Sequence, residues 1–96
     1  MKYAARIFEI QIRLYVSNSL KEKRRVKNKI FDSLANNFSL SIIEIGDHDV
    51  WNLLSFAFSF LSINEHQADQ KGAKIIRYLE NLTQSEGEIF SLEEYC

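Results

Sequence analysis

Residues 40–61, LSIIEIGDHDVWNLLSFAFSFL, contain a predicted β-hairpin. Apolar side chains dominate residues 40–45, and residues 46–49, GDHD, are a turn signal because glycine and aspartate tolerate the backbone angles of tight reversals. From Leu54 to Leu61 large apolar residues alternate with small ones, which is the period of two expected of a strand. An aromatic stripe with this period is usually buried, so we predict a core face made of Phe56, Phe58 and Phe60.

Strand and helix patterns flank the hairpin on both sides. Residues 5–16 also alternate, and one face of this strand carries Phe8, Ile10, Ile12, Leu14 and Val16. Residues 17–19, SNS, end the strand and supply N-cap candidates for an amphipathic helix over residues 20–38. A second helix is predicted after the capping residue Asn64, with Gly72 near its centre, and a last strand is predicted over residues 89–95.

The predicted element order is therefore β-α-β-β-α-β, with short connections. Right-handed crossovers favour a four-stranded antiparallel sheet with both helices on one face, which is the ferredoxin-like α+β sandwich. We predict a single ferredoxin-like domain over residues 1–96, because a chain of 96 residues suffices for one hydrophobic core but not for two.

Composition and cysteine use indicate where the protein works. No apolar run approaches the roughly 18 residues that a membrane span requires, so we expect no membrane association. The only cysteine, Cys96, cannot form a disulfide within the chain, and this favours a reducing cytoplasm.

Charge is distributed unevenly along the chain. Residues 1–48 hold nine Lys and Arg against five Asp and Glu, a formal charge of +4, whereas residues 49–96 hold three against eight, a charge of −5. Six of the twelve basic residues lie between Lys21 and Lys29. The chain is therefore not a generally basic nucleic-acid binder, and any such role must use a local patch.

The predicted topology brings this basic segment next to the hairpin turn. Cations in the first turn of a helix oppose its dipole by roughly 0.3–1 kcal/mol each, so an anion should offset them. That anion is either Asp47 and Asp49 of the turn or an external group such as phosphate, and an internal salt-bridge cluster is the plainer interpretation of the two. We predict that Lys23 extends along the helix rim to Asp47 or Asp49.

No catalytic constellation is evident in the sequence. Asp47, His48 and Asp49 are residue types that bind metals, but three adjacent turn residues cannot all converge on one ion, and their spacing matches no zinc motif. No nucleophile motif or glycine-rich phosphate loop is present. We therefore expect no enzyme activity, no metal and no cofactor.

The face of the sheet that lies opposite the helices is predicted to be open. The aromatic residues at 56–60 are similar to the exposed-strand aromatics of an RRM, but the basic residue and glycine of that motif are absent, which favours core packing instead. The small and apolar residues Ile7, Leu53 and Ala57 on the open face favour contact with a second copy. Trp51 is predicted to be either a plug at the edge of the core or an anchor for a partner.

Two segments resemble one protein family. Residues 19–26, SLKEKRRV, and residues 44–51, EIGDHDVW, are similar to the signature of the YlxP-like proteins, small bacterial proteins classed as a domain of unknown function. The likeness extends over essentially the whole chain, although typical members have an apolar residue where Lys27 stands. The resemblance implies a ferredoxin-like fold, a bacterial cytoplasmic location and association with RNA or ribosomes. It implies no established activity.

These observations lead to one main hypothesis and two alternatives. The main hypothesis is a non-enzymatic module that binds structured RNA, such as ribosomal RNA, through the basic residues Lys21, Lys23, Arg24 and Arg25. The turn residues Asp47, His48 and Asp49, with Trp51 beside them, would orient these cations or meet a partner. One alternative is a homodimeric or protein–protein module that uses the open sheet face. The other is a small enzyme or ligand-binding domain at the turn.

Overall fold

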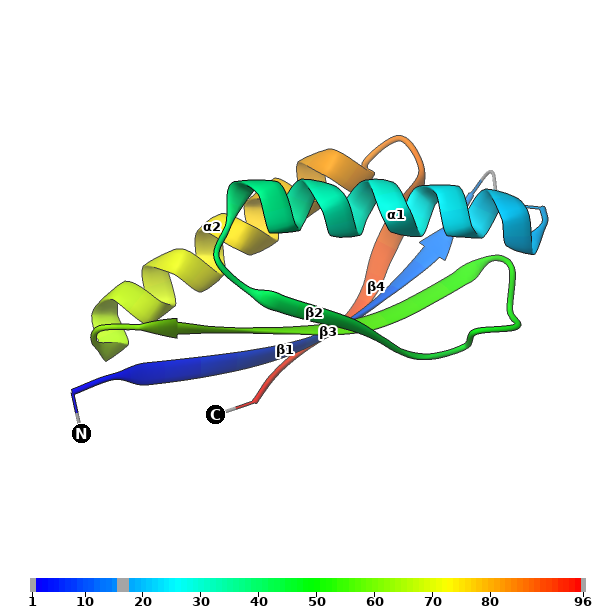
Figure 1. The fold of residues 1–96 in the computed structure, drawn as a ribbon. Coiled ribbons are helices and arrows are strands. Elements are labelled where there is room, and N and C mark those ends of the chain that lie inside the picture. Colours follow the sequence, from blue (N-terminus) through cyan, green and yellow to red (C-terminus); the bar gives the residue numbers. More distant parts are fainter. Residues whose placement is uncertain (1, 16–17, 96) are drawn as a thin grey trace.

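A computed structural model describes residues 2–15 and 18–95, and it contains the six predicted elements in the predicted order (Figure 1). The predictions for Val16, Ser17 and Cys96 lie outside the described residues. The strands are β1 (Ala4–Leu14), β2 (Ser41–Gly46), β3 (Leu53–Ser62) and β4 (Gly87–Tyr95), and the helices are α1 (Leu20–Asn37) and α2 (Glu65–Thr83).

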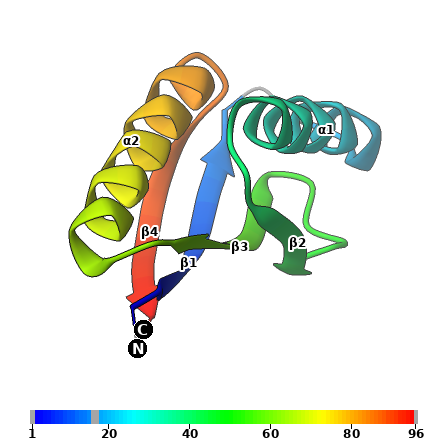
Figure 2. The ribbon, with the colours of Figure 1, turned by 60° about the vertical axis from the view of Figure 1, so that its left-hand side comes forward.

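The four strands form one antiparallel sheet in the order β2-β3-β1-β4. The register places Phe8 of β1 opposite Phe58 of β3, and Ile10 of β1 opposite Leu92 of β4. Both helices lie on the same face of the sheet, and the opposite face carries no helix (Figure 2). This arrangement is the ferredoxin-like α+β fold, as the sequence predicts.

The hydrophobic core lies between the sheet and the two helices. Phe56, Phe58 and Phe60 are all buried there, which confirms that the aromatic stripe is core. The rings of Phe8 and Phe58 stack with their centroids 5.1 Å apart. The helices contribute buried residues at helical spacing: Val26, Ile30 and Leu34 from α1, and Ala68, Ile75 and Leu79 from α2.

Each helix begins at a side-chain cap. The backbone N–H of Glu22 donates to the Ser19 hydroxyl at 3.1 Å, and that of Gln67 donates to the side-chain oxygen of Asn64 at 2.8 Å. The glycine at the centre of α2 also has a structural reason. A Cβ atom at Gly72 would lie 3.1 Å from Cζ of Phe8, so glycine lets α2 approach the sheet closely.

The connection between β2 and β3 is a pair of turns that is fixed to the rest of the sheet. Asp47 has a φ of 57°, in the left-handed region that aspartate tolerates better than most residues. Its carbonyl accepts the N–H of Val50 at 3.0 Å. The N–H of Leu14 donates to the carbonyl of Asn52 at 2.8 Å, which fastens the connection to the end of β1.

Candidate functional site

The start of α1 packs against the β2–β3 connection, as the topology predicted (Figure 1). The Lys23 ammonium donates a hydrogen bond to the backbone carbonyl of Asp47. Lys23 is only 3% exposed, which is unusual for a lysine and shows that its charge is compensated within the fold. The two segments that were expected to be neighbours are therefore in direct contact.

The carboxylate that neutralises Lys23 is not the predicted one. Glu44 of β2 lies 3.5 Å from the Lys23 ammonium, 3.8 Å from that of Lys27 and 3.5 Å from Nδ1 of His48. Lys23 does extend to Asp47, as predicted, but it binds the backbone carbonyl, and no ion pair joins Lys23 to the carboxylate of Asp47 or Asp49 in the described part of the chain. The sequence contained a signal for this contact. Glu44 follows Ile42 by two residues in β2, so both side chains lie on the face of the strand toward the helices.

Asp47 connects the two sides of the sheet. Its backbone carbonyl binds Lys23 on the helix side. Its carboxylate accepts a hydrogen bond from the Ser55 hydroxyl at 2.5 Å, and the amide of Gln11 in turn donates to that hydroxyl at 3.2 Å. Asp47 therefore positions Lys23 through its backbone, while its side chain belongs to a polar chain that crosses β3 and β1.

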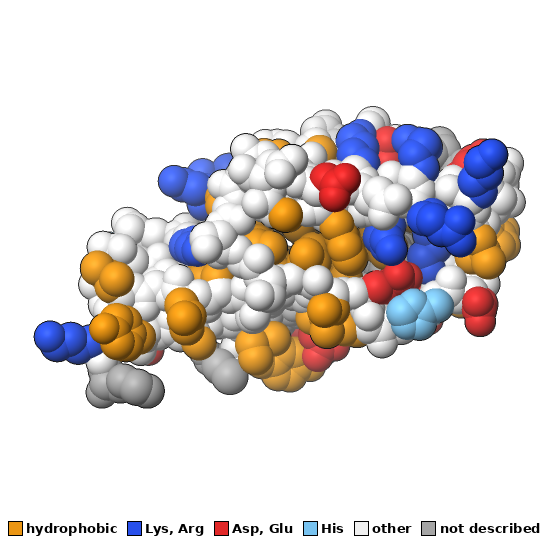
Figure 3. Space-filling view, in the orientation of Figure 1, with side chains coloured by type: hydrophobic (Ala, Val, Ile, Leu, Met, Phe, Trp, Pro, Cys, Tyr) orange, Lys and Arg blue, Asp and Glu red, His pale blue; other side chains and the backbone are white. Residues whose placement is uncertain are grey.

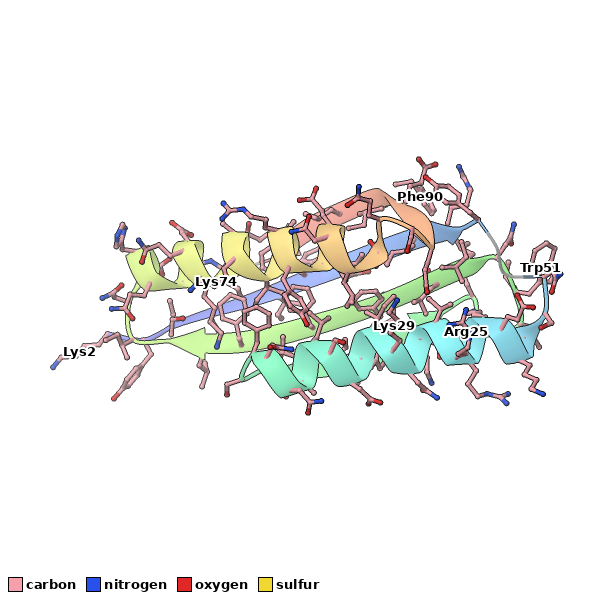
Figure 4. All side chains as sticks on the ribbon, turned by 90° about the horizontal axis from the view of Figure 1, so that it is seen from above. Lys2, Arg25, Lys29, Trp51, Lys74 and Phe90 are labelled. Atoms are coloured by element: carbon pink, nitrogen blue, oxygen red, sulfur yellow. The ribbon has the colours of Figure 1, made fainter. Side chains whose placement is uncertain are left out.

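The other basic residues of α1 fall into two groups. Arg25 and Lys29 lie on the side of the helix toward α2 (Figure 4), and both pair with Glu86, at 3.8 and 3.1 Å. Lys21 and Arg24 are exposed and have no acidic partner among the described residues. Lys and Arg side chains accordingly gather on the surface over the N-terminal half of α1 (Figure 3). The basic residues therefore do gather on one surface, but they differ in pairing: Arg25 and Lys29 have an acidic partner, whereas Lys21 and Arg24 have none among the described residues.

The remaining turn residues are solvent-accessible. Asp49 makes no hydrogen bond or ion pair within the described residues, and His48 is exposed apart from its contact with Glu44. Trp51 lies at the same end of the molecule and is 45% exposed (Figure 4). Its two predicted roles, an edge plug and a partner anchor, stay predictions.

A second charged cluster, at the opposite end of the sheet, was missed by the sequence analysis. The Arg6 guanidinium is buried and lies 2.5 Å from Glu65, 3.0 Å from Asp69 and 3.2 Å from Glu94. Its hydrogen bonds to Glu65 and then Asp69 raise the pKa of Arg6. The signal was the position of Arg6 on the core-facing side of β1. One cation held by three carboxylates joins β1, α2 and β4.

Two further features are absent from the described residues: a metal-ligating cluster and a membrane-spanning helix. No group of three or more His, Cys, Asp and Glu side chains is placed to hold a metal ion there. None of the helices within residues 2–15 and 18–95 has the length and apolarity to cross a membrane.

The fold and the charged edge define the class: a ferredoxin-like α+β protein in which a basic helix packs on an acidic hairpin. The chain belongs to the family described as "Protein of unknown function (DUF503)", which it matches over residues 6–93. "Uncharacterized protein YlxP" of Bacillus subtilis (strain 168) is 31% identical over 85 residues, which cover 88% of this chain and 92% of the relative. The resemblance found in the two sequence segments is therefore confirmed.

A solved structure is similar in fold. "De novo designed protein Foldit4" matches with a TM-score of 0.55 over 97% of this chain and 98% of its own. At 13% sequence identity this likeness concerns the fold alone.

Proposed function

We propose that the protein is a non-enzymatic module that binds structured RNA, such as ribosomal RNA, in the bacterial cytoplasm. The observation that carries this proposal is the state of Lys21 and Arg24. Both are exposed on one half of α1 and have no acidic partner in the described chain, whereas Lys23, Arg25 and their neighbours are paired. Unpaired surface cations are available to phosphates and release counterions when they bind them.

The structure changes the role proposed for one predicted contact. Lys23 is buried against Glu44 and Asp47, so it stabilises the contact between α1 and the β2–β3 connection and does not reach RNA. Lys21 and Arg24 are the proposed phosphate contacts, and Arg25, whose side chain is 60% exposed, is a third. Because the net charge of the chain is −1, affinity depends on how these few cations are placed and falls steeply with salt.

The test is co-sedimentation with ribosomal particles at about 50 and 500 mM salt, followed by binding to the RNA of the particle that retains the protein. K21A/R24A should weaken binding and lower the salt slope by about 1.4–1.8, since each neutralised phosphate contributes about 0.7–0.9. K74A/R77A removes two exposed cations from α2 and is the matched control. Equal loss in both variants, or no binding at low salt, would overturn the proposal.

A second candidate function is homodimerisation through the open sheet face near β2. Ile43 is 63% exposed and Leu61 is 73% exposed, and both lie near the free edge of the sheet. β2 contains no lysine or proline, the residues that prevent an exposed edge strand from pairing with another chain. β4, at the other edge, carries the charged residues Glu88, Glu93 and Glu94. Two copies related by a two-fold axis could pair their β2 edges and cover this apolar surface.

Light scattering at high salt tests the dimer. Hydrophobic and backbone contacts resist salt, so the dimer should persist at about 500 mM. I43K should give a monomer, because it places a charge at the centre of the paired edge. A wild-type monomer at every concentration would exclude this candidate and leave RNA binding unaffected.

A further inference from the structure

A small cavity lies between α1 and the β2–β3 connection. It has a volume of about 240 Å³ and is lined by Leu20, Lys23, Arg24 and Lys27 of α1 together with Glu44, His48 and Asp49. The four residues of α1 have the i, i+3, i+4, i+7 spacing of one helix stripe, so they face the hairpin together. The cavity thus has one wall from the basic helix and one from the turn.

The side chains that line this cavity carry a net positive charge. Lys23, Lys27 and His48 all contact the single carboxylate of Glu44, and both of its oxygens are engaged. Arg24 adds a guanidinium with no acidic partner among the described residues. Asp49 is the other acid at the wall. With neutral His48 the lining has a formal charge of +1, and with protonated His48 it has +2.

Arg24, Lys27 and His48 lie closer to solvent than Glu44 does, and Asp49 is the exposed acid of the lining. The side chain of His48 is 62% exposed and that of Lys27 is 27% exposed, while Glu44 is 17% exposed. A ligand that enters from solvent therefore meets Arg24, Lys27 and His48 before it meets Glu44. An arginine fork combined with a lysine point charge suits the oxygens of a phosphate group.

We propose that this cavity binds a terminal phosphate monoester of the RNA strand. A monoester carries about −1.5 to −2 at pH 7, whereas an internal diester carries one charge, so the monoester complements the cavity better. A terminal phosphate also has one ester bond instead of two, so it reaches into a recess more readily than an internal diester does. This inference rests on the proposed function and deepens it: Lys21 and Arg25 hold neighbouring diesters while the cavity selects the strand end.

Two RNA hairpins of the same sequence, one with a 5′-phosphate and one with a 5′-hydroxyl, test the proposal by fluorescence anisotropy. One added charge-assisted contact predicts that the phosphorylated RNA binds about tenfold more tightly. K27M and H48Q should each reduce this preference several-fold without changing affinity for the 5′-hydroxyl RNA. K29M is the matched control, because Lys29 lies on the other side of α1 and pairs with Glu86, and it should keep the preference.

The outcomes separate the cavity from the wider RNA interface. Equal, salt-sensitive binding of both RNAs overturns the cavity proposal but leaves the proposed function standing. Binding of neither RNA overturns the proposed function, and NMR titration with inorganic phosphate then decides about the cavity. A shift of the His48 imidazole signals, with those of His66 unchanged, supports a site for a free phosphate group. Unchanged His48 signals overturn the site.

Discussion

Replacing Lys23 by methionine tests the junction between α1 and the β2–β3 connection. The substitution removes the ammonium and keeps an unbranched apolar stem of similar length, so the packing is largely preserved. The ammonium makes two contacts that disappear: a hydrogen bond to the carbonyl of Asp47 and an ion pair with Glu44 at 3.5 Å. Lys23 is 3% exposed, so water replaces neither contact.

The contacts of Lys23 allow the loss of stability in K23M to be estimated. A hydrogen bond to a charged group contributes about 1.5–3 kcal/mol, whereas an uncompensated buried charge costs about 3–5 kcal/mol. Glu44 keeps Lys27 and His48 as partners, and Asp47 keeps the N–H of Val50. The lower range therefore applies, and we expect K23M to lower the free energy of unfolding by about 1.5–3 kcal/mol.

Urea unfolding monitored by the fluorescence of the single tryptophan, Trp51, measures this loss. E44Q and the double variant K23M/E44Q complete a mutant cycle. Because the double variant removes both charges, it should lose less stability than the sum of the single variants, by about 1 kcal/mol or more. A K23M variant within about 0.5 kcal/mol of the wild type, or strict additivity, would refute the assignment of Lys23 as a structural cation.

Three further predictions concern the sheet and the turn. A Cβ atom at Gly87 would clash with a backbone oxygen of β1, so G87A should be destabilised by about 1–3 kcal/mol in urea unfolding. A Cβ atom at Gly46 would meet nothing within 4 Å, so the stability of G46A should be unchanged. The hydrogen bond to Glu93 raises the pKa of Tyr95 to about 12, so ultraviolet titration should find one tyrosine ionising near that pH, and Y95F should remove it. The raised pKa means that this bond stabilises the fold below pH 10 and is lost as the pH rises to about 12. Asp47 has a φ of 57° and its side chain accepts the Ser55 hydroxyl, so D47A should cost at least about 1–2 kcal/mol. D47N keeps a side-chain oxygen and tolerates this φ, so it should cost less, and equal stabilities of the two variants would contradict this.

The sequence predicts most of the fold because its local signals agree. Strand alternation, the caps Ser19 and Asn64 and the turn at residues 46–49 each appear in the structure where they were expected. The crossover rule then gives the sheet order, and the sheet order places the two family segments side by side. Each of these features depends on backbone geometry, which short stretches of sequence encode directly.

The partners of the charged residues could not be predicted in the same way. The carboxylate that pairs with Lys23 is determined by the position of β2 relative to α1, and this position is fixed only when the two elements pack together. Arg6 was missed for a related reason: a charge on a core-facing position is stable only when Glu65, Asp69 and Glu94, from two distant elements, converge on it. Charge pairing across a fold follows from tertiary distances that periodicity does not contain.

The place of β1 in the sheet has a consequence for biosynthesis. Of the four strands, β1 is synthesised before the others, and it lies between β3 and β4, with Ala4 paired to Ser62 and Ile7 paired to Tyr95. At translation rates of about 5–20 residues per second, several seconds pass between the synthesis of β1 and that of its last partner. During that time the apolar side of β1 lacks its final neighbour. The nascent chain can form the β2–β3 hairpin early, but closing the sheet requires both the first and the last of the four strands.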